Sequence, residues 1–122
     1  MGEVKYDLQD LKKSEVATYF RDQLREAASG ISANVAEGFE RNNPPEFVNF
    51  LRYSLASLAE ARTRLKDGVQ RGYFAEADCR LAFTWARRCR PVLLNLLRSQ
   101  RHLIAADEAS GARPKRRRRR RT

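Results

Sequence analysis

The stretch GISANVAEGFERNNPPEF, residues 30–47, decides the fold because one helix built from small residues ends within it and another begins. Gly38 predicts the end of the first helix, since glycine readily adopts the left-handed backbone conformation found at helix C-termini. Asn42 and Asn43 favour a turn, and an asparagine before a proline is biased away from the helical conformation. Pro45 suits the first turn of the next helix, where its missing N–H group is not needed. The stretch therefore predicts two helices joined by a short loop.

Apolar residues at spacings of three and four extend this pattern to three helices, at about residues 14–37, 45–71 and 75–106. Ser14 is the expected N-cap of the first helix, and Gly72 is expected to close the second. Pro91 lies within the third helix and is expected to kink it. No segment alternates as a strand does, so we expect an all-α protein with antiparallel neighbouring helices. The residues expected to face inward are Val16, Phe20, Leu24, Ala27, Ile31, Val35, Phe47, Leu51, Leu55, Leu58, Leu65, Val69, Leu81, Trp85, Cys89, Val92, Leu93, Leu96, Leu97, Leu103 and Ile104.

Residues 1–13 contain Val4, Leu8 and Leu11 at helical spacing, but this segment is too short to form a stable helix alone. Three long helices and this stub predict an antiparallel up-down helical bundle of four-helix type with a shortened or missing first helix. Either the stub covers the remaining apolar groove or a neighbouring subunit covers it. We expect the bundle domain to occupy residues 1–110 and a disordered poly-arginine tail to occupy residues 111–122.

Small residues are concentrated in the segments AASGISANVA, residues 27–36, and SLASLAEA, residues 54–61. Two such faces permit close helix–helix approach, which explains a glycine at position 30 that otherwise costs about 1 kcal/mol within a helix. Asn34 is expected to be a buried amide bonded to the backbone of a neighbouring helix or loop, because an unsatisfied buried amide is costly. The alternative is an asparagine that contacts a ligand.

The net charge of +10 is unevenly distributed along the chain. Residues 1–78 carry a net charge of −2, whereas residues 79–106 carry +6 from six arginines and no acidic residue. Residues 107–122 carry another +6. The basicity therefore lies entirely toward the C-terminus, which indicates an anionic partner approached from one side of the molecule.

The third helix carries the first candidate nucleic-acid site. Arg88 lies nearer its apolar stripe and is expected to pair with an acidic residue elsewhere, and Trp85, at core spacing, is expected in the core rather than stacked on a base. The alternative for the remaining arginines is a face that is merely solvated. Those expected to share an outer face and to bind phosphates are Arg80, Arg87, Arg98 and Arg101.

The C-terminal run RPKRRRRRRT, residues 113–122, is the second candidate nucleic-acid site. A run of like charges repels itself and buries no apolar surface, so it is expected to be disordered when free. Arginine favours bidentate phosphate contacts and stacking on bases, which supply affinity without sequence specificity. With about eight phosphates neutralised, the logarithmic salt slope is roughly −6 on single strands and roughly −7 on duplex. The alternative is a solubilising or fortuitous tail. Its basic residues are Arg113, Lys115, Arg116, Arg117, Arg118, Arg119, Arg120 and Arg121.

Catalytic chemistry finds little support in the sequence. His102 is the only histidine and has no partner at metal-ligand spacing. Glu37 and Glu60 fit ion pairs better than a catalytic pair of carboxylates, and Glu60 has Arg64 four residues further on. We therefore expect a protein that is not an enzyme and that has no catalytic residue, cofactor or bound metal.

The cellular location is predicted from two features. The sequence contains no run of eighteen apolar residues, so we expect no membrane span, and its start does not resemble a signal peptide. Cys79 and Cys89, ten residues apart on one helix, cannot face each other, and they suit reduced thiols. We expect a cytoplasmic protein.

The stretch SGISANVAEGFERNNPPEFVNFLRYSLASLAEARTRLKDGVQRGYF, residues 29–74, resembles a known family. This four-helix-bundle family has founding members encoded by intervening sequences in bacterial 23S ribosomal RNA genes. The resemblance covers about residues 14–105 in order and spacing. The positions that carry it are Ile31, Asn34, Val35, Ala36, Glu37, Gly38, Phe39, Glu46, Phe47, Phe50, Leu51, Ser57, Leu58, Ala59, Glu60, Gly72 and Tyr73.

The resemblance implies a homopentamer of four-helix bundles and a non-enzymatic role. Relatives of the family include the accessory protein of diversity-generating retroelements, a basic pentameric barrel that binds nucleic acid and a reverse transcriptase. The family's first long helix is mostly missing here, and the arginine tail lies outside the family pattern. We expect a non-catalytic oligomeric protein that binds nucleic acid, with RNA favoured over DNA. The alternative is an oligomeric scaffold that binds a partner protein such as a reverse transcriptase, and a membrane surface is disfavoured because no lipidation signal is present.

Overall fold

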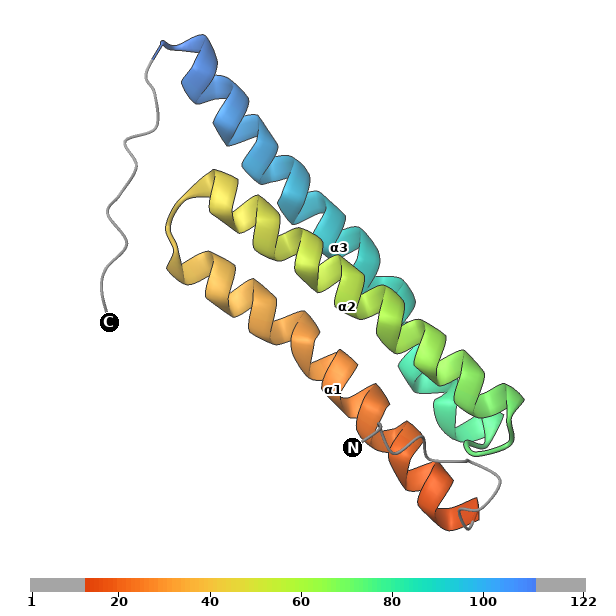
Figure 1. The fold of residues 1–122 in the computed structure, drawn as a ribbon. Helices are drawn as coiled ribbons and strands as arrows, with labels where there is room; N and C mark the ends of the chain where they lie inside the picture. Colours follow the sequence, from red (N-terminus) through yellow and green to blue (C-terminus); the bar gives the residue numbers. More distant parts are fainter. Residues whose placement is uncertain (1–12, 112–122) are drawn as a thin grey trace, which may run out of the picture.

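A computed structural model describes residues 13–111, which form three helices and no strand. The helices are α1 (Lys13–Glu40), α2 (Pro44–Gln70) and α3 (Glu76–Ala109). They run up, down and up, with α2 in the middle (Figure 1). α2 packs against both neighbours, whereas the backbones of α1 and α3 do not approach each other within 8 Å. The prediction of an all-α chain with antiparallel neighbours is confirmed, and within the described residues α1 and α3 each have α2 as their only helical partner.

The loop between α1 and α2 follows the predicted turn chemistry. Asn42 has a positive φ of 49°, a conformation that asparagine tolerates better than most residues. Asn43 caps α2, because its side-chain oxygen accepts a hydrogen bond of 3.2 Å from the backbone N–H of Glu46. The first turn of α2 holds the two prolines, so the helix begins one residue earlier than predicted. At its other end Gly72 has a φ of 78°, as expected for the glycine that closes α2.

Gly38 does not end α1, so that part of the prediction was wrong. The helix continues to Glu40, and Gly38 is buried within it against α2. A Cβ atom at this position would lie 2.6 Å from Cβ of Phe50 and 2.9 Å from Cδ1 of Phe47. The glycine is therefore needed for close approach of two helices rather than for a left-handed cap. Ser14 is not the N-cap either, because α1 already includes Lys13.

The predicted close contact between small residues of α1 and α2 is present. A Cβ atom on Gly30 would lie 2.7 Å from the Oγ atom of Ser57, so no larger residue fits without a shift. Ser54 is fully buried, and its hydroxyl donates a 2.7 Å hydrogen bond to the backbone carbonyl of Ile31. Asn34 is half-buried and bonded, but the predicted partner was wrong, because its Nδ2 atom donates to the carbonyl of Gly30 in its own helix at 2.7 Å.

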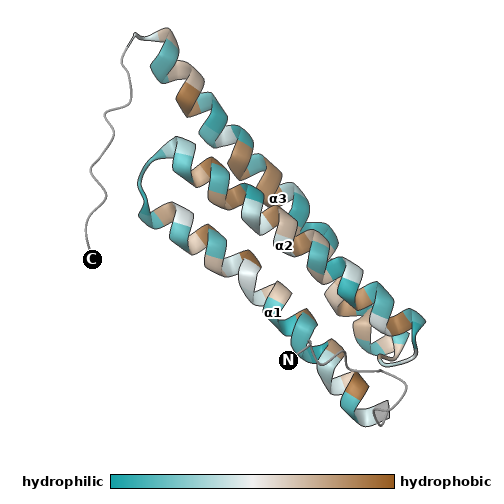
Figure 2. Ribbon diagram, in the orientation of Figure 1, coloured by the Kyte–Doolittle hydropathy of each residue, from teal (hydrophilic) through white to brown (hydrophobic). Residues whose placement is uncertain are grey.

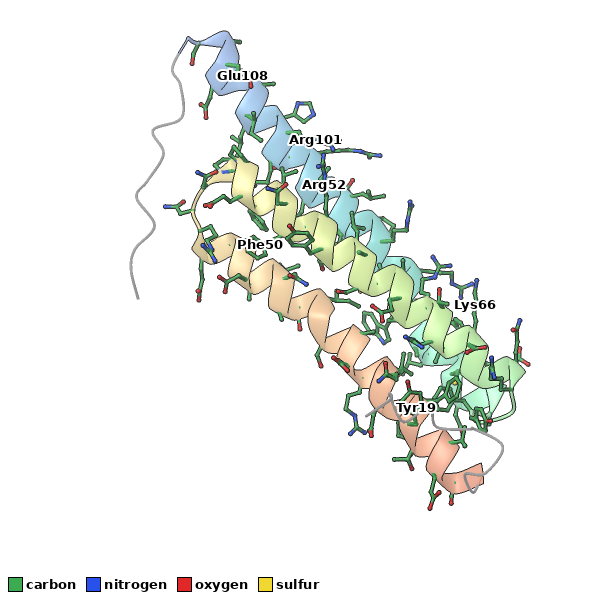
Figure 3. All side chains as sticks on the ribbon, viewed as in Figure 1. Tyr19, Phe50, Arg52, Lys66, Arg101 and Glu108 are labelled. Carbon is green, nitrogen blue, oxygen red and sulfur yellow. The ribbon has the colours of Figure 1, made fainter. Side chains whose placement is uncertain are left out.

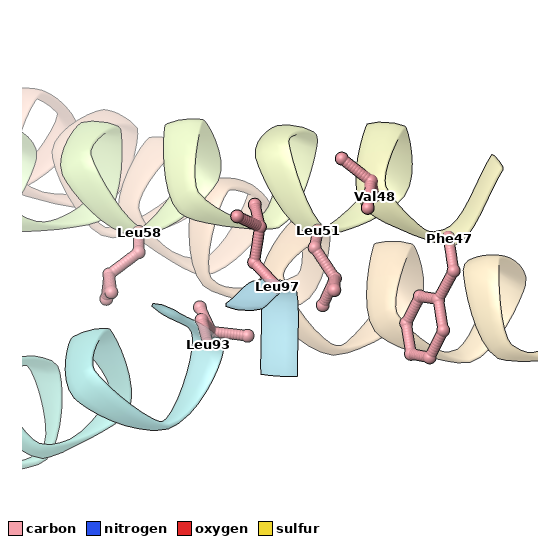
Figure 4. Packing of buried hydrophobic residues seen from close by; sticks show 6 residues of the cluster. All are labelled: Phe47, Val48, Leu51, Leu58, Leu93 and Leu97. Carbon is pink, nitrogen blue, oxygen red and sulfur yellow. The ribbon is translucent and has the colours of Figure 1, made fainter. Parts of the chain in front are cut away.

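The core lies where α2 meets both neighbours. Leu51, with no exposed surface, is at its centre, and Leu93 and Leu97 of α3 pack against it and against Leu58 (Figure 4). Side chains of α1 complete this cluster from the other side, chiefly Ile31 and Val35. Burial of these apolar side chains is the main favourable term that holds the three helices together.

Part of the apolar stripe predicted to face inward on α3 is exposed instead. Figure 2 shows hydrophobic positions recurring along the whole length of α3, more than a single neighbouring helix can cover. Trp85 was expected in the core but has 56% of its surface exposed, and the guanidinium of Arg88 lies over its ring at 5.8 Å. The exposed members of the stripe, named here the α3 apolar stripe, are Leu81, Trp85, Val92 and Leu103.

The contact at Gly38 leads to a stability prediction. Alanine normally stabilises a helix relative to glycine by about 1 kcal/mol. Here we expect Gly38→Ala to lower the free energy of unfolding by about 1–3 kcal/mol, because the added methyl group meets the Cβ atom of Phe50 and cannot be relieved by rotation of a flexible side chain. Urea denaturation followed by circular dichroism measures the change, and an unchanged or higher midpoint would contradict the packing described here.

Candidate nucleic-acid interface

The four arginines that the sequence assigned to an outer face of the third helix are all exposed on α3. Arg80, Arg87, Arg98 and Arg101 lie within about 60° of one another around the helix axis, because an α-helix turns by about 100° per residue. Arg80 and Arg101 are 21 positions apart, or about 32 Å along the axis at about 1.5 Å per residue. The spacing therefore aligns four cations on one side of α3.

Helix α2 adds cations that the sequence analysis did not assign to a site. Lys66 and Arg52 lie about 120° and about 160° around α2 from Ser54, which packs on α1, and Arg62 lines a groove that α2 shares with α3. Figure 3 shows Arg52 and Arg101 at the same end of α2 and α3, with Lys66 further along. Their spacing along α2 gives no signal by itself, since only the antiparallel packing of α2 on α3 brings the two sets together.

Arg90 is one of the six arginines of the third helix, but the sequence did not assign it to the outer face, and it lies beside Arg62. Both side chains line a shallow groove of about 300 Å³ between α2 and α3. The remaining lining residues are apolar, namely Leu55, Ala56, Leu58, Ala59 and Leu94. The name α2–α3 basic face is used below for Arg52, Arg62, Lys66, Arg80, Arg87, Arg90, Arg98 and Arg101.

The charges of this face are not neutralised by the ion pairs found among residues 13–111. Those pairs join Arg41 to Glu37 at 2.7 Å, Arg64 to Glu60 at 3.7 Å and Arg71 to Asp67 at 2.9 Å. Each joins two residues four apart on the surface, the pairing predicted for Glu60, and such exposed pairs contribute a few tenths of a kcal/mol.

The acidic residues in the middle of α2 are therefore already occupied. Glu60 and Asp67 each hold an arginine that lies outside the α2–α3 basic face. The hydrogen bond and the charge of Asp67 raise the pKa of Arg71 above its ordinary value. Helix α3 has no acidic residue from Cys79 to Ala106. In the part of the chain that the structure describes, no cation of the α2–α3 basic face takes part in an ion pair.

An arrangement of this kind attracts an extended anion. Like charges placed along one line, with nothing to neutralise them, produce a positive field that reaches about 8 Å at physiological ionic strength. Arginine also presents a planar fork of N–H donors that matches the geometry of phosphate oxygens. The α2–α3 basic face is therefore chemically suited to contacts with a phosphate backbone.

The aromatic side chains of Trp85, Tyr73 and Phe74 lie away from the α2–α3 basic face. Trp85 is separated from the arginines of the α2–α3 basic face by about 140° or more around α3. Tyr73 packs on Phe20 with ring centroids 4.8 Å apart, and Phe74 fills the space beside Gly68. Within residues 13–111 no aromatic side chain lines the groove at Arg62 and Arg90.

The histidine, the two cysteines and the tail residues are not part of the α2–α3 basic face. His102 is exposed on α3, and the described residues contain no group of three or more side chains suited to hold a metal ion. Cys79 and Cys89 are both free thiols. The basic residues of the C-terminal tail lie outside the described residues, and they are Arg113, Lys115, Arg116, Arg117, Arg118, Arg119, Arg120 and Arg121.

The family model for 23S rRNA-intervening sequence protein matches residues 3–93, which is three quarters of the chain. The chain belongs to this family. The match includes α1, α2 and the first half of α3, and so contains Asn34, Glu37, Gly38 and Glu60 of the predicted motif. No curated protein and no solved structure matches this member of the 23S rRNA-intervening sequence family.

None of the helices within residues 13–111 has the length and the apolar character that crossing a bilayer requires.

The two thiols are expected to differ in reactivity. Cys79 is buried, with 6% of its surface exposed, and burial together with the nearby charge of Asp78 raises the pKa of its thiol. Only the thiolate is nucleophilic, so a buried thiol with a raised pKa reacts slowly. Each thiol is measured alone, Cys79 in a Cys89→Ser variant and Cys89 in a Cys79→Ser variant. At pH 7.5 we expect Cys79 to react with a disulfide reagent about tenfold more slowly than Cys89. The rate at Cys79 should still be rising as the pH passes about 9, its unperturbed value. Faster reaction at Cys79 than at Cys89 would contradict the burial of Cys79.

Proposed function

We propose that this protein is a non-catalytic, oligomeric nucleic-acid-binding protein that prefers RNA. The observation that carries the proposal is the α2–α3 basic face, where eight cations gather without an ion pair among the described residues. Binding of a polyanion satisfies these charges, whereas no described cluster of side chains offers a metal site. The proposal that the protein is not an enzyme rests on the sequence, where His102 has no partner at metal-ligand spacing and Glu37 and Glu60 suit ion pairs.

The phosphate backbone supplies the affinity in this proposal. Each arginine or lysine that neutralises a phosphate releases a condensed counterion, so binding weakens steeply as salt rises. These contacts carry no sequence information, and the protein therefore recognises a class of nucleic acid rather than one sequence. The preference for RNA rests on arginine, which stacks on unpaired bases as well as binding phosphates. The tail, residues 113–122, adds a second set of cations to the same ligand.

Assembly as a homopentamer belongs to the same proposal. The α3 apolar stripe is exposed and lies on a helix that has one helical neighbour among the described residues, which favours contact with a further helix. Contact between unlike faces of successive copies closes into a ring when the rotation allows it. A fourth helix supplied within or between copies would complete the four-helix type of bundle that the family resemblance implies. Repetition around a ring would also multiply the basic face into a larger field.

A second function is favoured by the α3 apolar stripe alone. An oligomeric scaffold that binds a partner protein, such as a reverse transcriptase, would use Trp85 and its exposed neighbours as the contact. Nucleic-acid binding would then be incidental. For both functions we propose a cytoplasmic location and no membrane partner.

The nucleic-acid proposal is tested by neutralising two cations at a time in the full chain. We expect Arg98→Gln with Arg101→Gln to weaken RNA binding and to reduce the logarithmic salt slope by about 1.4–1.8, because two phosphate contacts are lost. The matched control is Arg21→Gln with Arg25→Gln, which removes the same charge from exposed positions of α1. Fluorescence anisotropy in four salt concentrations measures both pairs. Equal effects of the two pairs would reject a defined face, and no salt-sensitive binding to any polyanion would reject the function.

The oligomer is tested through the α3 apolar stripe. Val92 has 60% of its surface exposed, so Val92→Glu should leave the helical content unchanged. We expect the variant to sediment at a lower mass than the wild-type protein, because a charge cannot be buried in an apolar interface without a partner. Asn49→Glu, at an exposed position of α2, is the matched control. Analytical ultracentrifugation that finds one mass for all three proteins would contradict an interface at this stripe.

A further inference from the structure

The groove at the centre of the α2–α3 basic face has an apolar floor. Leu58 is buried beneath it, and Leu55 and Leu94 are half-buried along its walls. The groove exists because two lining positions are small and exposed, Ala56 and Ala59, where longer side chains would fill the space. Its volume of about 300 Å³ falls at the lower end of the range for small-ligand sites.

Phosphate contacts alone do not explain such a groove. A phosphate oxygen is best bound by N–H donors and gains nothing from contact with leucine side chains. The groove instead places apolar surface directly beside the side chains of Arg62 and Arg90. A nucleobase matches this pairing, because its faces are apolar and stack on guanidinium planes while its edges remain polar.

We propose that the groove receives one unpaired nucleobase of a bound strand, a step that rests on the function proposed above. The base contacts Leu55, Leu58 and Leu94 with one face, and Arg62 and Arg90 stack on it or bind the adjoining phosphates. The strand continues in both directions along the basic face. Arg101 lies about 16 Å from Arg90 along the axis of α3, and Arg87 about 5 Å in the other direction.

The ligand is therefore expected to be unpaired where it meets the groove. In a duplex the base faces are stacked on one another and cannot enter the groove, so a duplex contacts only the cations around it. A single strand or a bulge supplies both the phosphates and a free base face. A helical peptide with leucine and glutamate side chains would also match a groove that is apolar inside and cationic at the rim. Nucleic acid is favoured because the cations extend about 32 Å along α3, well beyond the groove, as a uniformly charged backbone requires.

The test fills the groove without changing any charge. Ala59→Leu places a larger side chain in the groove at an exposed helical position, and leucine is a good helix former. Ala36→Leu, an exposed position of α1 on the side away from α2, is the matched control. Each full-length protein is titrated with a labelled twelve-nucleotide poly-uridine RNA and with a blunt twelve-base-pair RNA duplex. The duplex has the denser charge, so its absolute affinity cannot be compared directly with that of the single strand. The readout is the change in affinity for each RNA that a substitution causes relative to the wild-type protein.

We expect Ala59→Leu to weaken binding of the single strand about tenfold, the lower part of the range for loss of one stacked base, and to change binding of the duplex less than twofold. Ala36→Leu should change neither. A second variant, Arg90→Lys, keeps the charge but removes the planar group, and we expect it to weaken the single strand selectively as well.

Three results would overturn the inference. Equal weakening of both ligands by Ala59→Leu, or no effect on either, would leave the basic face as a phosphate site without a base pocket, and the proposed function would stand. Tighter binding of a leucine- and glutamate-containing helical peptide, with loss of that binding in Ala59→Leu, would assign the groove to a protein partner. Failure of the wild-type protein to bind either RNA would instead reject the proposed function itself.

Discussion

The hydrogen bond from the Ser54 hydroxyl to the carbonyl of Ile31 fixes which side of α2 meets α1. It forms because Gly30 and Gly38 let the two helices approach to distances at which a Cβ atom on either glycine would clash. Side chains leave a helix at fixed angles, so this one contact also sets the direction of every other side chain on α2. Leu51 and Leu58 then face the core, and Arg52 and Arg62 lie toward α3.

The distribution of charge follows from that orientation. Arg41, Arg64 and Arg71, which lie away from the boundary of α2 and α3, are each held by a carboxylate one turn away. The cations along the boundary have no such partner among residues 13–111, although the helices that carry them are well packed. At the groove between Arg62 and Arg90, cations without an ion-pair partner lie next to apolar side chains. A fold this small can thus present a charged surface and an apolar contact without a separate binding domain.

Much of the fold was predictable from local signals. Helix number, the asparagine turn, Gly72 and the close contact at Gly30 follow from periodicity and residue size. Trp85 was misplaced because a periodic stripe shows which residues share a face but not how many neighbours cover it. Gly38 was misread because a glycine required by a neighbouring helix resembles one required by a turn. Arg52, Arg62, Lys66 and Arg90 were missed because their site arises only when α2 packs against α3.

The central claim is that the folded helices, and not the arginine tail alone, bind nucleic acid. RNA binding by residues 1–110, measured beside the full chain over a series of salt concentrations, tests it most directly. The account predicts that the shorter protein still binds RNA with a steep salt dependence. Removal of the eight tail cations should lower the logarithmic salt slope for a single strand by no more than about 6. Loss of all binding in the shorter protein would contradict the claim and leave the helices with a scaffolding role.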